Sequence, residues 1–248
     1  MDISRPAGLP AKIASELAVA AGLTITAAAL LSFTLHLAVP FVAFTTLLGL
    51  GLTAAVGVFW ALSPPTHRPQ DADSLGLANQ VTLGRGVLIC VVAGFIPFNE
   101  YAQTHAWTVA SITLIALILD GVDGAAARRT RSHSAFGARF DMELDALLIL
   151  ILCGLTIVMD KAGAWVLLIG LYRYIFVVMG RLYPKLTQPL PESFRRKTIC
   201  VWQLVTLMIC LLPLITPSMA TGLLALALAL LTYSFMKDIV WLIRQPKR

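Results

Sequence analysis

The sequence predicts an all-α integral membrane protein with about eight transmembrane helices. Of its 248 residues, 58% are hydrophobic and only 13% are charged, about half the charged fraction of a soluble domain. The mean hydropathy is +0.82, and apolar residues form long stretches over the whole length. Eight spans of about 20 residues fit into such a chain and leave only short loops. This composition excludes an ordinary cytosolic enzyme.

The spans follow from these stretches in order. The first two lie near 13–34 and 39–62, on either side of a short turn at 35–40. The stretch 13–33 is too long for the apolar region of a signal peptide and has no clear cleavage pattern, so we expect a retained span. The Pro-rich, charged segment 63–76 is expected outside the bilayer. Further spans are predicted near 80–98, 106–125, 136–158, 164–182, 198–214 and 219–243.

Polar or helix-breaking segments separate the last six spans. They are FNEYAQTH at 98–105, an Arg-rich segment around residue 130, DKAG at 160–163, KLTQPLPESFRRK at 185–197 and the turn at 213–217. No tandem repeat is visible, nor any matched pair of Gly/Pro-broken helices typical of inverted-repeat transporters.

The basic residues predict the orientation of the spans. When the loops are assigned alternately to two sides, one side receives Lys161 alone, and the other receives Arg5, Lys12, Arg68, Arg128, Arg129, Arg131, Arg139, Arg181, Lys185, Arg195, Arg196, Lys197, Arg244, Lys247 and Arg248. By the positive-inside rule, the basic side and both termini are cytoplasmic, in a bacterial-type plasma (inner) membrane. The net charge of +6 is therefore explained by the orientation of the spans in the membrane, and we expect no nucleic-acid partner.

Four aspartates are predicted at membrane depth, where charged side chains are costly and are functional candidates by default. Asp120 and Asp123 end the fourth span, and Asp141 and Asp145 begin the fifth. Spacings of three and four place each pair on one helix face. Small residues extend the two faces: Gly124 and Ala127 on the first, Gly137 on the second.

Four converging carboxylates in a site of low dielectric constant need a cation to stay ionised. Hard oxygen ligands suit Mg²⁺, Mn²⁺ or Ca²⁺, and two such ions commonly serve displacement at phosphorus. The alternative is that the aspartates pair with nearby arginines at the capped ends of two helices. Matching faces with small residues beside the carboxylates favour the metal site.

The run from Asp120 to Asp145 resembles the signature of the CDP-alcohol phosphotransferases (CDP-alcohol phosphatidyltransferases), D-x2-D-G-x2-A-R-x8-G-x3-D-x3-D. All of its specified positions are present: Asp120, Asp123, Gly124, Ala127, Arg128, Gly137, Asp141 and Asp145. The resemblance implies the six-helix catalytic core of that family at 79–248. Residues 1–78 then form an extra pair of helices and a cytoplasmic linker, which the family core does not include.

The resemblance also implies roles for these residues. Asp120, Asp123 and Asp141 would hold two divalent ions, Mg²⁺ or Mn²⁺, and Asp145 would complete the metal site and act as general base. The CDP pocket would be lined by Gly124, Ala127, Arg128 and Gly137. The implied reaction transfers a phosphatidyl group from CDP-diacylglycerol to a polar alcohol and releases CMP. We expect the enzyme to be a homodimer surrounded by membrane lipids.

A second, weaker motif begins the third span. Asn79, Thr82 and Arg85 are similar to the N-x-x-T-x-x-R at the head of the first core helix of that family, which places Asn79 and Thr82 beside the CDP-lipid. Alternatively, Asn79 or Thr82 is an ordinary N-terminal helix cap. Arg85 either reaches the same phosphates or snorkels to the membrane interface.

Three further cations are candidates for binding the acceptor or a lipid phosphate: Arg173, Arg196 and Lys197. Arg173 lies deep in its span, so it faces an anionic ligand or a structural partner. Arg196 and Lys197 bind phosphate, or they serve topology and lipid headgroups. Arginines near the site that the signature does not specify favour a phosphorylated acceptor over choline, because choline needs an aromatic cage. However, glycerophosphate-using members of the family typically have Lys after the last aspartate, whereas Ala146 stands here.

A cation- or proton-coupled transporter is the alternative function, because it also uses intramembrane carboxylates. A transporter places its ionisable residues near the midplane, accessible from both faces. The four aspartates are instead predicted at one cytoplasmic level, which favours the enzyme.

Overall fold

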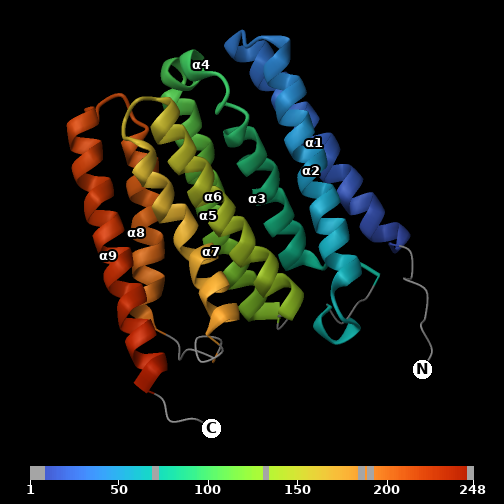
Figure 1. Cartoon of the computed structure of the whole chain (residues 1–248). Coiled ribbons are helices and arrows are strands. Elements are labelled where there is room, and N and C mark those ends of the chain that lie inside the picture. The colour runs from blue at the N-terminus through green and yellow to red at the C-terminus, as the bar shows by residue number, and fades with distance from the viewer. Residues whose placement is uncertain (1–8, 69–72, 131–133, 184–187, 189–192, 245–248) are drawn as a thin grey trace. The chain divides into compact units, whose positions relative to one another are not determined.

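The computed structural model is all-helical over the residues that it describes, which are 9–68, 73–130, 134–183, 188 and 193–244, without the side chains of 122–130. Figure 1 shows the helices coloured along the chain. Their order is α1 (Ala11–Leu35), α2 (Val39–Leu62), η1 (Pro65–His67), α3 (Leu77–Ala93), α4 (Asn99–Thr104), α5 (Ala106–Thr130), α6 (Ala135–Val158), η2 (Ala164–Val166), α7 (Leu167–Leu182), α8 (Phe194–Cys210) and α9 (Pro217–Arg244).

The long helices confirm the predicted fold class. In the described residues, α1, α2, α9 and the segment Ala164–Leu182 are long and apolar enough to cross a membrane, and Leu77–Ala93 and Ala106–Gly121 are shorter apolar helices. Large apolar side chains face outward on α1, where Phe33 is 82% exposed. A soluble protein rarely exposes such continuous apolar surface, whereas lipid covers it in a membrane protein.

Several helix boundaries differ from the sequence prediction by a few residues, and two of the differences have a local cause. The third helix ends at Ala93 rather than near residue 98, because a turn at 94–97 leads to Pro97, which cannot continue the helix. The segment 98–105 was predicted as a loop but contains α4, since Glu100, Ala102 and Gln103 favour helix. The α4 helix is anchored where the Tyr101 hydroxyl accepts a 3.2 Å hydrogen bond from the backbone N–H of Ala38.

The chain divides into two compact units, 1–145 and 146–248. In the first unit, α1 packs along α2, both contact α3, and α3 packs on α5. Close approach of α1 and α2 needs a small residue, because a β-carbon on Gly49 would lie 2.6 Å from the Thr24 methyl carbon. Phe41 packs on Phe95 with a centroid distance of 4.9 Å, which ties α2 to the end of α3.

In the second unit, α9 packs against α7 and α8. The Arg195 guanidinium at the start of α8 donates to the backbone oxygen and Oγ of Ser234, at 2.7 and 2.8 Å, and pairs with Asp238 at 2.5 Å. At the other end of this unit, Lys161 Nζ donates to the backbone oxygens of Leu212 and Ile215. Lys161 thus satisfies backbone oxygens just after the end of α8, where carbonyls lack helical partners, whereas Arg195 binds within α9.

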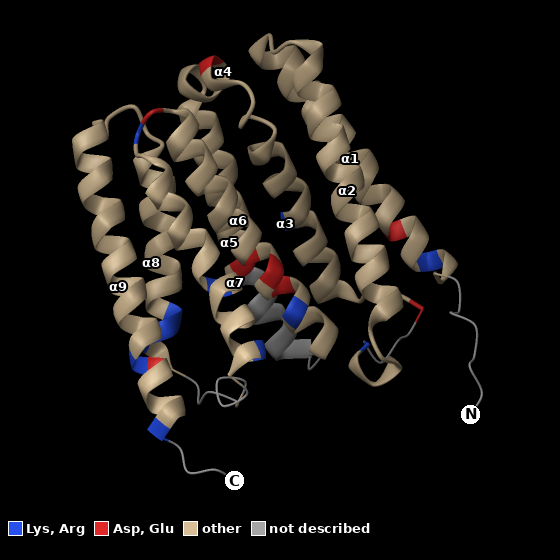
Figure 2. Ribbon diagram, in the orientation of Figure 1, with Lys and Arg blue, Asp and Glu red and all other residues tan. Residues whose placement is uncertain are grey.

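Charged residues are unevenly distributed along the helices. In the first unit, Figure 2 shows most of them at the end where α1 begins and α2 stops, with Glu100 on α4 at the opposite end. Long uncharged helical segments between two polar levels are typical of a bilayer-spanning bundle.

Candidate active site

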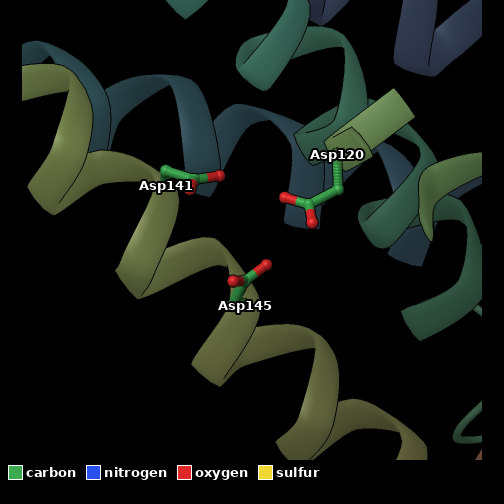
Figure 3. Close-up of side chains that lie close together, drawn as sticks. All are labelled: Asp120, Asp141 and Asp145. Atoms are coloured by element: carbon green, nitrogen blue, oxygen red, sulfur yellow. The ribbon is translucent and has the colours of Figure 1, made fainter. Parts of the chain in front are cut away.

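Three of the four signature aspartates lie together in the first unit. Asp120 comes from α5, and Asp141 and Asp145 come from successive turns of α6. Each offers one carboxylate oxygen, and these three oxygens lie within 4.8 Å of one another. Figure 3 shows the three side chains directed toward a common space. The predicted convergence of carboxylates from two helices is therefore present, and we call this group the aspartate cluster.

Arg85 of α3 lies at the centre of the aspartate cluster. Its Nη1 is 2.7 Å from Asp120 Oδ1 and 2.5 Å from Asp141 Oδ1, and its Nη2 is 2.7 Å from Asp145 Oδ1. The Arg85 side chain is only 1% exposed, whereas the carboxylates are 25–38% exposed. The guanidinium is therefore buried beneath the carboxylates, which keep an open side.

This burial decides one of the two predictions for Arg85, and whether Arg85 also reaches phosphates stays a prediction. Snorkelling to the interface was wrong, because the side chain is buried and its guanidinium pairs with carboxylates of two other helices. The sequence did contain a signal, since a buried Arg in an apolar helix needs anionic partners. The aspartates were the available anions, but they lie 35 to 60 positions away along the chain.

The donor set of the aspartate cluster fits a divalent cation. Among the described side chains, three carboxylates share one guanidinium, so the group has an excess of two negative charges when all three are ionised. All the donors are hard oxygens, the ligands that Mg²⁺ and Mn²⁺ prefer. Their partial exposure leaves a side from which an ion and phosphate oxygens can approach. Among the residues that the structure describes, Asp120, Asp141 and Asp145 therefore form a group that suits a metal site.

The other predicted residues of the signature lie partly outside the described side chains. Asp123, Gly124, Ala127 and Arg128 belong to α5, whose backbone is helical to Thr130, but their side chains fall outside the described part of the chain. Their roles stay predictions.

Asn79 and Thr82 lie in the first turns of α3, but neither caps the helix. The N-cap is Gly76, which makes no side-chain capping bond. Asn79 Nδ2 instead donates to the backbone oxygen of Leu75 at 2.7 Å, and Thr82 Oγ1 donates to that of Ala78 at 3.0 Å. The capping interpretation was therefore wrong, and both residues are buried. Whether they contact a nucleotide stays a prediction.

Gly137 begins the half of the signature carried by α6 and packs tightly against α3. A β-carbon at Gly137 would collide with Asn79 Oδ1 and would lie 3.2 Å from Ser134 Oγ. Ser134 Oγ also accepts a 3.0 Å hydrogen bond from the Gly137 N–H. The glycine thus lets the Asn79 amide reach the first turn of α6, one turn before Asp141.

We expect Gly137→Ala to reduce stability by about 1–3 kcal/mol, the usual cost of overpacking. Asn79→Ala, which makes room for the added methyl group, should recover part of that loss in the double variant. Thermal unfolding of the two single variants and the double variant would measure the coupling, expected at about 0.5–3 kcal/mol for residues in contact. Strictly additive effects would contradict the close contact.

The three predicted acceptor-site cations belong to the second unit. Arg173 lies on α7 and is partly exposed. Arg196 Nη1 is 3.4 Å from Asp238 Oδ1, so Arg196 contributes to the connection between α8 and α9. Lys197 is exposed on the first turn of α8. Their proposed binding of the acceptor or a lipid phosphate is not tested by these contacts.

Comparison with known proteins identifies the family. Neither a curated protein nor a solved structure matches the chain. The model of the CDP-alcohol phosphatidyltransferase family matches residues 75–233, which include α3, the aspartate cluster and most of the second unit. This match covers well over half of the chain and supports a phosphotransferase rather than a transporter. The chain belongs to the CDP-alcohol phosphatidyltransferase family.

Proposed function

We propose that this protein transfers a phosphatidyl group from CDP-diacylglycerol to a polar alcohol and releases CMP. The observation that carries the proposal is the aspartate cluster, three partly exposed carboxylates from two helices around one buried guanidinium. Family membership supports the reaction class. The apolar helices suit a donor that remains in the bilayer while its headgroup reaches the cluster.

The proposed division of labour follows the family resemblance, and the grouping of Asp120, Asp141 and Asp145 supports it. Asp120, Asp123 and Asp141 hold two divalent ions, Mg²⁺ or Mn²⁺, with Asp145 completing the set. Such ions neutralise the pyrophosphate and stabilise the charge on the leaving CMP. Asp145 removes the proton from the acceptor hydroxyl, whose oxygen then bonds to the lipid-side phosphorus as the bond from that phosphorus to the CMP oxygen breaks.

Arg85 has a supporting part in this proposal. It donates to Asp141 and Asp145 and forms an ion pair with Asp120, so it fixes the orientation of the three carboxylates before the donor arrives. The CDP moiety lies along Gly124, Ala127, Arg128 and Gly137, with Asn79 and Thr82 near it. Arg173, Arg196 and Lys197 are proposed to attract the acceptor or a lipid phosphate, which favours a phosphorylated acceptor.

We further propose that the catalytic core begins at residue 79 and that 1–78 is an added helix pair with a linker, in agreement with a family match that starts at residue 75. The enzyme would work as a homodimer in a bacterial-type plasma membrane, with the active site and both termini in the cytoplasm. The basic residues on that side and the soluble nature of CMP support this orientation.

The proposal is tested by incubating the purified protein with CDP-diacylglycerol, Mg²⁺ and a panel of alcohols. We expect CMP release that depends on both the ion and one class of acceptor. The panel would contain phosphorylated acceptors (glycerol phosphate and inositol phosphate), a neutral one (free inositol), a zwitterionic one (serine) and a cationic one (choline). If no acceptor yields CMP with either Mg²⁺ or Mn²⁺, the proposed function is wrong.

The orientation predicts a labelling pattern at two exposed positions of the first unit, Thr66 and Gln103. In a variant without native cysteines, Thr66→Cys should react with an impermeant thiol reagent only in inside-out vesicles. Gln103→Cys, on α4 at the opposite end, should react only in right-side-out vesicles. The reverse pattern would place the aspartate cluster on the side without soluble substrate.

A further inference from the structure

The N-terminal helix pair contacts the elements that carry the aspartate cluster at three places. It lies outside the residues that match the family model, which begin at residue 75. Both α1 and α2 nevertheless pack on α3, which supplies Arg85. The contacts involve a hydrogen-bonded connection from α1, an aromatic group on α2 and an apolar contact beside Arg85.

The hydrogen-bonded connection starts at Glu16 of α1. Its Oε2 accepts from the backbone N–H of Leu75, and its Oε1 accepts from Gln80 Nε2, both at 3.0 Å. The backbone oxygen of the same Leu75, which is fully buried, accepts from Asn79 Nδ2 at 2.7 Å. Asn79 Oδ1 in turn occupies the space beside Gly137. Three steps therefore connect α1 to the first turn of α6.

The aromatic group joins the end of α2 to the same turn of α6. Phe136, the residue before Gly137, is 1% exposed and lies between Phe59 and Trp60, each with a centroid distance of 5.0 Å. Arg68 holds this end of α2, since its guanidinium lies 5.2 Å above the Trp60 ring and donates to the backbone oxygens of Trp60 and Ser63. Stacked and edge-to-face aromatic pairs have preferred geometries and are worth about 0.5–1.5 kcal/mol beyond the area that they bury.

The apolar contact is directly beside Arg85. A β-carbon at Gly86 would lie 2.6 Å from Leu52 Cδ2 and 3.7 Å from a methyl carbon of Leu144, the neighbour of Asp145. The space over Gly86 is thus filled by α2 on one side and α6 on the other. All three contacts converge on the parts of α3 and α6 that hold the guanidinium and the two α6 carboxylates.

We infer that the N-terminal helix pair sets the geometry of the aspartate cluster, with Glu16 and Trp60 as positioning residues. The pair does so through α3 and the first turn of α6, without contributing a carboxylate to the cluster. The expected effect on catalysis rests on the proposed function. The effect of the helix pair on the geometry of the aspartate cluster does not. A misplacement far from the chemistry can lower the rate by up to about a hundredfold.

The coupling is tested directly by hydrogen exchange in the full-length protein. Glu16→Ala removes both acceptors, and Trp60→Leu removes the ring beside Phe136. We expect amides at 137–145 to exchange about tenfold faster in each variant, because the charge-assisted bond to the Leu75 N–H or the aromatic contact with Phe136 no longer holds this part of α6. Glu16→Gln should restore wild-type exchange, since its amide oxygen accepts from Leu75 and its nitrogen can donate to a rotated Gln80. Ser15→Ala, an exposed neighbour bonded only within α1 to Lys12, is the matched control.

Two further measurements separate positioning from simple anchoring. Binding of Mn²⁺ alone should weaken about tenfold in Glu16→Ala and Trp60→Leu. In a wild type that releases CMP, both variants should lose about tenfold in kcat with an unchanged KM for the alcohol. If exchange increases only in α1 and α2, while exchange at 137–145 and Mn²⁺ affinity stay as in Ser15→Ala, the inference is wrong. A wild type without CMP release would reject the proposed function, and the exchange result would still decide the coupling.

Discussion

Replacing Asp145 by Asn is expected to lower kcat by about a hundredfold to ten-thousandfold, the usual contribution of a positioned general base. Asn keeps the size of the side chain but cannot take up the proton of the acceptor hydroxyl. Asp120 and Asp141 remain, so Mn²⁺-dependent binding of CDP-diacylglycerol should stay largely intact. Steady-state kinetics together with donor binding to the variant would measure both effects.

Two other variants sharpen this prediction. Glu143→Gln removes a carboxylate from the same turn of α6, outside the aspartate cluster, and should leave kcat close to that of the wild type. Asp120→Asn should weaken binding of metal and donor together, because Asp120 is proposed as a metal ligand. Near-normal turnover in Asp145→Asn would overturn the assignment of the base.

Replacing Arg85 by Gln is expected to destabilise the metal-free protein by about 3 kcal/mol or more, the cost of breaking a buried ion pair. Three carboxylates from two helices would then face one another without the guanidinium that neutralises them. At about 2–4 °C per kcal/mol, thermal unfolding in a chelator should shift down by roughly 6–12 °C.

The same variant should depend on divalent ions more strongly than the wild type does. Mg²⁺ or Mn²⁺ can supply the missing positive charge, and binding to the folded state alone raises stability. Addition of either ion should therefore recover much of the lost stability in Arg85→Gln. Arg139→Gln, which removes an exposed guanidinium from α6, is the matched control. An unfolding temperature equal to that control, with or without ions, would contradict the central role of Arg85.

Much of the fold was predictable from the sequence because hydropathy and helix breakers are local signals. The bounds of α2, 39–62, follow from the preceding turn and the following Pro-rich segment. The α4 helix could not be found in this way, because a six-residue segment with mostly polar side chains carries no apolar periodicity. Its position depends on the contact between Tyr101 and Ala38, which are distant in the sequence.

The candidate site was predictable where its residues share a helix. Spacing of four placed Asp141 and Asp145 on one face, and the two lie in one cluster with Asp120. Arg85 was predicted only to reach the phosphates or to snorkel to the membrane interface, since spacing cannot show which helix faces which. The connection from Glu16 through Leu75 and Asn79 to Gly137 was not predictable for a further reason, because each of its three steps uses a backbone atom or the absence of a side chain.

The fate of the lipid-side phosphate tests the central claim most directly. CDP-diacylglycerol labelled with ³²P at that phosphate would be incubated with the protein, Mg²⁺ and the acceptor found in the panel. We predict that the label enters a new phosphodiester lipid, that the released CMP is unlabelled, and that both products disappear in Asp145→Asn or in a chelator. Label in phosphatidic acid together with a CMP-alcohol, or no new labelled lipid with any acceptor and ion, would contradict phosphatidyl transfer at the aspartate cluster.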